Sequence, residues 1–265
     1  MNTHRLALHH IGGSLVAPGA TLTALTMHGT DSRTIMENQG TPFIIDAWSL
    51  CQAAGIFQIN SPMMHDDQDC LKFRNIAAQC YSLLPQPVKV PLVPGDTLNL
   101  RGTGSAVALD RENFSVLIQY TDPKAAVGRY ITYQELILNM VHPVTLEFAV
   151  TAGVAGGYAG SLALSGAVTD KLKGYRDYAV LGMTTSIIQG ALTMYGPDLG
   201  NLRIGVPGTT NREFNKDYFV SLSRNHAGPM IPVINASNKA ATFIETVNDE
   251  NAASPIVTLY LALLR

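Results

Sequence analysis

The segments AWSLCQAAGIFQINSPM (residues 47–63) and GMTTSIIQGALTMYGPD (residues 182–198) align without a gap. Gly55 then coincides with Gly190 and Pro62 with Pro197, at an offset of 135 positions (190 − 55 = 197 − 62) in a chain of 265 residues. With the offset shortened by four positions, LKFR (residues 71–74) corresponds to LRIG (residues 202–205). A repeat of about half the chain length predicts two copies of one domain.

Alternation of apolar and polar residues is the dominant pattern in both copies. VTLEFAVT (residues 144–151) places its large apolar residues on one face, which predicts a β-strand with that face on a core. The same pattern predicts strands at residues 88–90, 97–101, 114–120 and 202–206. Apolar runs predict strands buried on both faces at residues 43–50, 178–183, 218–222 and 256–264. Turn-forming residues separate these segments, so we predict about eight strands and one β-sandwich in each half.

One segment has a helical signature. Thr132 and Glu135 have the spacing of a capping box, apolar residues follow at helical spacing, and Pro143 provides a stop. We therefore predict a first domain over residues 1–130, a helical linker over 131–143 and a second domain over 144–265. A second short helix is expected at residues 75–83. The polar segment 29–41 and the Gly-rich segment 152–168 are expected to be long loops after the first strand of each half.

Composition argues against several classes of protein. The chain has 14% charged residues, 18 Lys+Arg against 20 Asp+Glu, and no Lys/Arg cluster in its sequence, so direct contact with nucleic acid is not expected. Cys51, Cys70 and Cys80 cannot all pair within one chain and are interpreted as buried thiols of a reducing compartment. The first 20 residues contain no uninterrupted apolar segment, so no signal peptide is expected. The longest apolar run, at residues 256–264, is about half the length of a membrane-spanning helix.

The search for chemistry yields one weak metal candidate, formed by His65, Asp66, Asp67 and Asp69. Carboxylates and an imidazole this close could hold a hard cation or zinc. The spacing of a calcium-binding loop is missing, however, and these residues form an insertion without a counterpart in the second half, so a polar loop is the simpler interpretation. The other histidines are expected to be surface or hydrogen-bonded residues. No nucleophile elbow, zincin motif or phosphate-binding loop is present, so we expect no enzyme, no cofactor and no catalytic residue.

With this organisation, the chain resembles the compact double jelly-roll major capsid proteins of tailless icosahedral viruses, which include phages with an internal membrane. The features that carry the resemblance are the Gly55/Gly190 and Pro62/Pro197 repeat, the Pro94-Gly95-Asp96 turn, and the closing strands at residues 114–120 and 256–264. The chain lies at the small end of the sizes found in that family. The resemblance implies an all-β fold of two tandem eight-stranded jelly-roll β-sandwiches with a short helix between them. It also implies that three copies form a pseudo-hexameric homotrimer, which tiles an icosahedral shell.

The same resemblance implies a place in the virion after assembly in the host cytoplasm, and contact with neighbouring capsomers, with minor capsid proteins or an internal membrane as further partners. The two long loops would face outward, and residues 1–13 would contact a neighbour or the interior. Three alternatives stay open: a two-domain jelly-roll protein that binds glycans, a bicupin-like metal protein, and a low-copy phage spike or vertex protein. An exposed aromatic pair on a sheet face would favour glycan binding, bound metal would favour the enzyme, and copy number would identify the spike.

Overall fold

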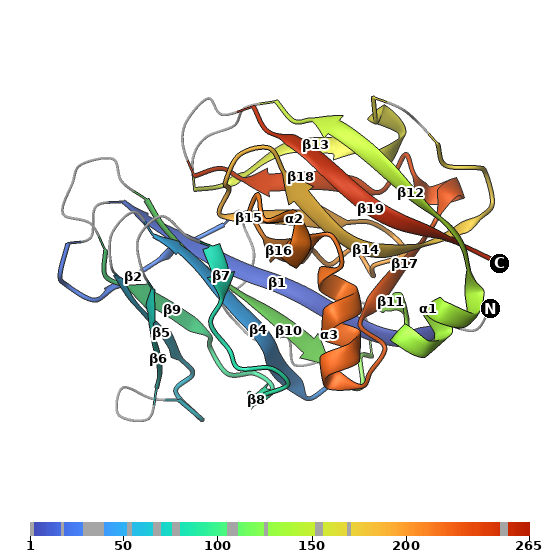
Figure 1. Cartoon of the computed structure of the whole chain (residues 1–265). Coiled ribbons are helices and arrows are strands. Elements are labelled where there is room, and N and C mark those ends of the chain that lie inside the picture. The colour runs from blue at the N-terminus through green and yellow to red at the C-terminus, as the bar shows by residue number, and fades with distance from the viewer. Residues whose placement is uncertain are drawn as a thin grey trace.

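A computed structural model describes residues 3–16, 19–28, 40–51, 55–65, 70–75, 80–104, 111–124, 127–151, 156–168, 171–249 and 254–265. The fold is mostly β, as predicted: these residues form one 11-stranded and two four-stranded sheets, with every pairing antiparallel. Figure 1 shows the first half of the chain below and the second half above, with the long first strand running between them. None of the helices in the described part of the chain is long and apolar enough to cross a membrane.

The described residues of the first half form eleven strands. They are β1 (His4–Val16), β2 (Thr23–Ala24), β3 (Thr26–Met27), β4 (Pro42–Cys51), β5 (Gly55–Asn60), β6 (Leu71–Asn75), β7 (Cys80–Ser82), β8 (Val90–Pro91), β9 (Asn99–Gly102), β10 (Arg111–Tyr120) and β11 (Gly128–Ile131). Within the large sheet the order is β1-β10-β4-β7, with β8 also paired to β4, and the facing small sheet has the order β2-β9-β5-β6. Apolar side chains between these sheets, such as Ile11, Phe57 and Phe114, form one core.

The second half begins with a helix. Its elements are α1 (Tyr133–Asn139), β12 (Met140–Ala149), β13 (Tyr158–Ala163), η2 (Leu164–Gly166), β14 (Asp177–Thr185), β15 (Ala191–Tyr195), β16 (Ile204–Pro207), α2 (Arg212–Asn215), α3 (Tyr218–His226), β17 (Ile231–Asn235), η3 (Ala236–Asn238), β18 (Phe243–Val247) and β19 (Ile256–Leu264). Its part of the large sheet has the order β12-β19-β14-β17, and its small sheet the order β13-β18-β15-β16.

The strand order of the first half recurs in the second. If β1, β2, β4, β5, β6, β7, β9 and β10 are numbered one to eight, the large sheet has the order 1-8-3-6 and the small sheet 2-7-4-5. Numbering β12 to β19 in the same way gives the same two orders. The third strands begin at Pro42 and Asp177, which are again 135 positions apart (177 − 42). The sequence repeat therefore corresponds to a repeat in strand order.

The two halves share their large sheet, which differs from the expectation of two separate sandwiches. β11 pairs with the start of β1, where His4 faces Tyr130, and with β17, where Ile131 faces Ile231. The sheet of the first half is also covered on its second face. Leu8, Trp48 and Leu117 on that face belong to the core of the second half, which explains why β4 is buried on both sides.

Three local predictions had mixed outcomes. The capping box is confirmed, because the Thr132 hydroxyl accepts from the Glu135 amide and the Glu135 carboxylate accepts from the Thr132 amide. The helix expected at residues 75–83 is wrong, since Asn75 ends β6 and residues 80–82 form β7. The strand expected at residues 218–222 is also wrong. These residues begin α3, where Tyr218, Phe219, Val220 and Leu222 are buried, and a short apolar run does not distinguish a strand from a helix.

The expected long loops are only partly described. Within residues 152–168, β13 and η2 occupy residues 158–166, so most of that segment is strand and helical turn instead of loop. Residues 152–155 and 29–39 lie outside the described residues. Short Gly-rich segments have weak strand propensity, and here pairing of β13 with β18 supplies what the local sequence lacks.

Candidate functional site: the junction between the two halves

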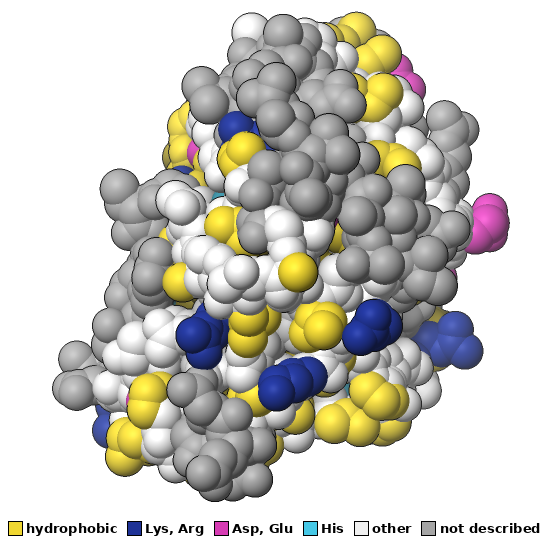
Figure 2. Space-filling model, turned by 90° about the vertical axis from the view of Figure 1, so that its left-hand side faces the viewer, with side chains coloured by type: hydrophobic (Ala, Val, Ile, Leu, Met, Phe, Trp, Pro, Cys, Tyr) yellow, Lys and Arg dark blue, Asp and Glu magenta, His cyan; other side chains and the backbone are white. Residues whose placement is uncertain are grey.

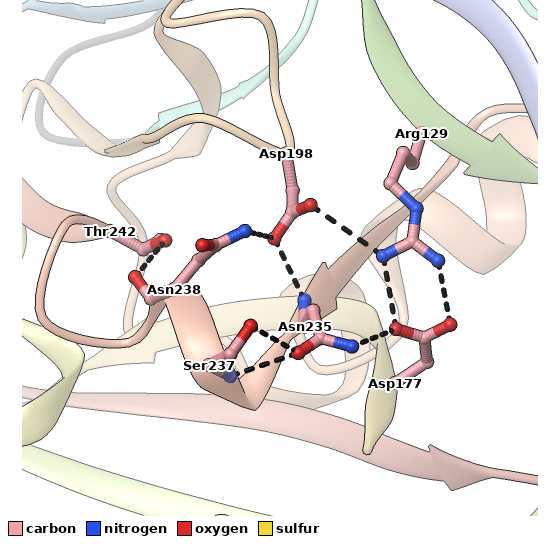
Figure 3. Close-up of polar contacts among 7 residues, drawn as sticks. All are labelled: Arg129, Asp177, Asp198, Asn235, Ser237, Asn238 and Thr242. Carbon is pink, nitrogen blue, oxygen red and sulfur yellow. Dashed lines mark hydrogen bonds and ion pairs between the residues drawn. The ribbon is translucent and has the colours of Figure 1, made fainter. Parts of the chain in front are cut away.

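The first polar cluster of the junction is centred on Arg129 of β11 (Figure 3). The Arg129 guanidinium donates to both oxygens of Asp177, at 3.0 and 2.6 Å, and its Nη1 lies 3.5 Å from Asp198 Oδ1. The Arg129 amide also donates to the Asp198 carbonyl at 2.8 Å. Asp177 begins β14 and Asp198 follows β15, so this arginine attaches the joining strand to two parts of the second half.

A second layer of hydrogen bonds holds both carboxylates. Asn235, at the end of β17, donates its amide to Asp198 and its side-chain Nδ2 to Asp177, both at 2.8 Å, and Asn238 Nδ2 donates to Asp198 at 2.8 Å. Figure 3 shows these side chains converging on the two carboxylates. Burial by itself would raise the pKa of Asp177, but the hydrogen bonds from Arg129 and Asn235 hold that pKa below its ordinary value. Asp177 is thus kept ionised, and both carboxylates serve as structural anchors.

The second cluster of the junction is a buried stack of rings. His10 of β1 stacks on Trp48 of β4, with ring centroids 5.4 Å apart, and its Nδ1 lies 3.0 Å from the hydroxyl of Tyr158 of β13. The Arg203 guanidinium lies 4.3 Å from the centroid of the Tyr158 ring and donates to Glu245 at 2.8 Å. The Trp48 indole donates to the Gly190 carbonyl at 3.3 Å. The ring stack is therefore built from residues of both halves of the chain.

His28 extends this stack and has a defined tautomer. Ser14 Oγ donates its proton to Asn113 Oδ1 at 2.6 Å, so it must accept from His28 Nε2, which lies 2.7 Å away. The Nδ1 atom of His28 then carries no proton, and no hydrogen-bond partner for it exists among the described residues. Burial lowers the pKa of His28 to about 3, against a smaller opposing effect of Asn113, and burial also lowers the pKa of His10 well below its ordinary value. Both rings are neutral near pH 7.

Glycines allow the two halves to approach this closely. A Cβ atom at Gly205 of β16 would lie 2.8 Å from the His10 ring, and one at Gly190 would lie 2.8 Å from the side chain of Asn113. Gly190 is one of the two repeat glycines. Its counterpart Gly55 faces the Thr103 carbonyl, 2.6 Å from where a Cβ would stand. Gly55 begins β5, and Gly190 directly precedes the equivalent strand β15. At both positions a neighbouring segment comes so close that only glycine fits.

The third cluster of the junction surrounds a buried carboxylate. Asp46 of β4 accepts hydrogen bonds from the Tyr218 hydroxyl of α3 at 2.6 Å, from the Ala47 amide at 2.8 Å and from the Ser82 hydroxyl. Burial raises the pKa of Asp46 to about 6, although these hydrogen bonds act to lower it. A pocket of about 180 Å³ lies beside Asp46 and is also lined by Phe214 and Asp217. The Asp46–Tyr218 hydrogen bond joins the first half to the second.

The metal candidate from the sequence is only partly described. His65 Nε2 lies 3.2 Å from the Pro91 carbonyl, whereas Asp66, Asp67 and Asp69 lie outside the described residues. Among the residues that the structure describes, no group of three or more His, Cys, Asp and Glu is placed to hold a metal ion.

Two of the three cysteines can be placed with their side chains. Cys51 is a buried thiol, and Cys70 is a partly buried thiol that accepts a hydrogen bond from the Gln58 side-chain amide. Burial, aided by Glu112, raises the pKa of the Cys51 thiol to about 11, which makes it a poor nucleophile. The side chain of Cys80 lies outside what the structure describes.

Basic residues are spread over one side of the molecule. Figure 2 shows Lys and Arg side chains as a loose band among hydrophobic and uncharged ones. In the small sheet of the first half, Gln58 pairs with Lys72 on one side and with Arg101 on the other. The sequence did not show this neighbourhood, because the two basic residues come from separate strands.

The main residues that sequence reasoning missed are the junction histidines. His10 and His28 are hydrogen-bonded, which is one of the two outcomes expected for the histidines, but the sequence did not indicate that they are buried in the junction. The sequence of β1, HRLALHHIGGSLV, gives little indication that His10 is buried. By alternation alone His10 could face solvent, and it is buried because both faces of β1 are covered. Chemically, the junction supplies packing, fixed charges and buried hydrogen bonds between the two halves.

Comparisons with known proteins assign no family. No family model and no curated protein matches the chain. Among solved structures, the PBSX exported protein XepA matches with 9% identity, over 94% of this chain and 86% of that one, with a TM-score of 0.24. The Sulfolobus Turreted Icosahedral Virus structure matches with 8% identity, over 97% and 90% of the two chains, with a TM-score of 0.22. The Macrobrachium rosenbergii nodavirus structure matches with 9% identity, over 99% and 89%, with a TM-score of 0.21. At TM-scores this low, the likenesses carry no argument about function.

Proposed function

We propose that the chain is a structural capsid protein. Each half, over residues 1–130 and 144–265 with the linker 131–143 between them, is a jelly-roll β-sandwich. Three copies form a pseudo-hexameric homotrimer that tiles an icosahedral shell. The protein acts in the virion and contacts neighbouring capsomers, with minor capsid proteins or an internal membrane as further partners.

The observation that carries this proposal is the recurring strand order. Two four-stranded layers with the orders 1-8-3-6 and 2-7-4-5, present once in each half, match the two-sheet, eight-strand arrangement of a jelly roll, which viral capsid domains use. Lectins and cupins also use the jelly-roll arrangement, so strand order alone does not distinguish a capsid protein from a lectin or a cupin. The joining of two such units edge to edge through β11 favours a building block that tiles.

The chemistry of the junction supports a structural role over an enzymatic one. A metal or acid–base centre in a jelly roll needs ionisable groups that converge on a space open to substrate. Here Asp177 and Asp198 are held by Arg129 and by amides, and His10 lies between Trp48 and Tyr158. These groups are committed to holding the halves together.

Glycan binding is not favoured by the stacked aromatic pair on a small sheet of the second half. Tyr195 and Phe243 face each other on neighbouring strands of a small sheet and are both half-buried. Their rings stack at a centroid distance of 5.2 Å with an interplanar angle of 18°. A sugar platform needs free ring faces. Here one face of each ring is covered by the other ring, and the Arg203 guanidinium lies 5.1 Å from the centroid of the Tyr195 ring.

Electron microscopy of the purified protein tests the proposal. Negatively stained particles are expected to show a hexagonal outline with three-fold averages, since six sandwiches from three copies surround one axis. Single bilobed particles at every concentration would contradict it. Counting copies in the source particle separates a major shell protein, present in hundreds of copies or more, from a spike or vertex protein.

A further inference from the structure

The connection from η2 to β14 contains a basic turn that presents an aromatic ring to solvent. The turn, KLKGYR (residues 171–176), includes Lys171, Lys173 and Arg176, which are all exposed. No two of these cations are adjacent in the sequence, so the segment does not stand out as a basic run. Tyr175 among them is 89% exposed, although tyrosine usually buries much of its ring. The basic turn therefore combines three cations with an uncovered aromatic side chain.

The exposure of Tyr175 is imposed by an ordered backbone. Its φ angle of 62° lies in the left-handed region, which is uncommon for residues with large side chains. Before it, the Lys173 amide donates to the Tyr178 hydroxyl at 2.9 Å. After it, the Arg176 carbonyl accepts from the Ala236 amide at 2.9 Å. Strained backbone that the surrounding fold maintains is concentrated at functional sites.

The basic turn lies at the same end of the large sheet as an apolar patch on α1 and the start of β12. His142 of β12 pairs with Leu263 of β19, and Leu263 pairs with Tyr178 of β14, so the three strands are level there. In Figure 1 the segment before β14, the helix α1 and the C-terminus lie together at the right-hand margin. The apolar patch consists of Ile137, Leu138, Met140 and Val141, whose exposed fractions are 54%, 70%, 44% and 52%.

Cations lie near both parts of the apolar patch. Arg224 of α3 is exposed, and its guanidinium lies 5.2 Å from the centroid of the Tyr133 ring of α1. The basic turn precedes β14, which is separated from β12 only by β19. Exposed apolar side chains accompanied by Lys and Arg are the pattern of protein surfaces that lie on anionic membranes.

The nearby carboxylates are engaged with basic side chains. Glu135 of α1 lies 2.9 Å from His4, and Asp177, which follows the basic turn, lies 2.6 Å from Arg129. Asp170, which precedes the turn, lies outside the described residues. The charge that the described residues leave exposed at this end is therefore positive, and an anionic partner is complementary to it.

We propose that the basic turn and the apolar patch dock on the surface of a membrane that contains anionic lipids. The cations of the turn contact the lipid headgroups, Tyr175 lies at headgroup level, and the aliphatic side chains of the patch reach the boundary of the hydrocarbon region. A nucleic acid offers anionic groups as well, but it leaves the aliphatic side chains without a partner. The inference deepens the proposed function, because it names the surface that meets the internal membrane.

The number of cations sets the expected strength. Each Lys or Arg held close to an anionic membrane changes partitioning about five-fold, and salt screens this attraction. One copy should therefore bind weakly. Several copies in one assembly should bind much more tightly, because the later contacts form within an assembly that is already bound.

Co-sedimentation of the full chain with vesicles tests the proposal. The wild type should bind vesicles of phosphatidylcholine that contain phosphatidylserine, should bind pure phosphatidylcholine far less, and should dissociate as salt is added. The double variant Lys173→Gln/Arg176→Gln should partition ~25-fold more weakly. Its matched control, Lys72→Gln/Arg74→Gln, removes two exposed cations of β6 in the first half and should bind like the wild type.

Tyr175→Gly separates the role of the ring from that of the backbone. Glycine adopts a left-handed conformation without strain, so the variant should melt no lower than the wild type. It should nevertheless bind the anionic vesicles several-fold more weakly, because the ring is lost. Binding as tight as that of the wild type would remove Tyr175 from the docking surface and contradict the proposal.

The other outcomes are equally decisive. Equal binding by the Lys173→Gln/Arg176→Gln variant and its control overturns the proposal, and so does a wild type that does not bind the anionic vesicles at low salt. Binding to single-stranded DNA instead of vesicles, lost in the same variant, would assign the surface to nucleic acid. Light scattering on the same samples distinguishes the two proposals. A trimer that does not bind vesicles removes only this inference, whereas a monomer that binds them keeps the docking surface and contradicts the capsid building block.

Discussion

Replacing His28 with Gln should make the protein much less sensitive to acid. His28 is neutral and buried, its Nε2 donates to Ser14, and its Nδ1 has no acceptor nearby among the described residues. A second proton on this ring would be buried without a partner. Gln retains a donor near the position of Nε2 but cannot titrate.

The sign and size of the effect follow from the two pKa values. Burial lowers the pKa of His28 from 6.5 to about 3 in the folded protein. As the pH falls below 6.5, His28 therefore binds a proton in the unfolded chain but stays neutral in the folded protein. The free energy of unfolding decreases as a result. Between about pH 7.5 and about pH 5 the loss amounts to ~2 kcal/mol, and it approaches ~5 kcal/mol only below the folded-state pKa.

Urea unfolding at the two pH values measures this difference. The wild type should lose ~2 kcal/mol more than His28→Gln over that range, whatever the absolute stability of the variant. His142→Gln is the control, because it removes an exposed imidazole on β12 and should leave the wild-type loss intact. Equal losses in the wild type and in His28→Gln would refute the account of a buried neutral imidazole.

Three further changes test two other parts of the junction and the packing of α2 on β14. Asp46→Asn should act in the opposite direction. The pKa of Asp46 is raised from 3.8 to about 6 in the folded protein, so the stability of the wild type falls as the pH rises through this window. The variant should lose up to ~3 kcal/mol less than the wild type between about pH 4 and about pH 7.5. Arg129→Met should lower the free energy of unfolding by ~2 kcal/mol, less than for a fully buried pair because the arginine is 30% exposed; an unchanged urea midpoint would count against the anchoring role. Gly182→Ala should cost ~1–3 kcal/mol, since its Cβ would collide with the Asn215 carbonyl, while Gly157→Ala, with nothing within 4 Å, should leave the melting temperature unchanged.

Strands and the repeat could be predicted from the sequence because their signals are local. Alternation at residues 144–151 sets which face is buried, and β12 follows it. The alternation at residues 114–120 predicts a strand correctly, but β10 is buried on both faces because the second half covers its outer face. The capping residues Thr132 and Glu135 are three positions apart, so α1 could be predicted as well. The offset between Gly55 and Gly190 placed equivalent strands correctly, and both glycines lie where a side chain would collide, with the Thr103 carbonyl at Gly55 and with the Asn113 side chain at Gly190.

Features that depend on contacts between the halves could not be predicted. Tyr218 and Phe219 belong to a helix because they pack between β14 and the first half, and their apolar run alone reads equally well as a strand. His10 lies in a core because the second half covers the outer face of β1. β11 joins two sheets through partners about 100 or more residues away in the sequence, and no local pattern encodes that.

The mass of the purified protein in solution tests the central claim most directly. Light scattering on the eluting protein, over a wide range of concentrations, should give about 85 kDa, three times the 28.4 kDa of one chain. A constant 28.4 kDa up to the highest concentration would contradict a capsid building block made of three copies.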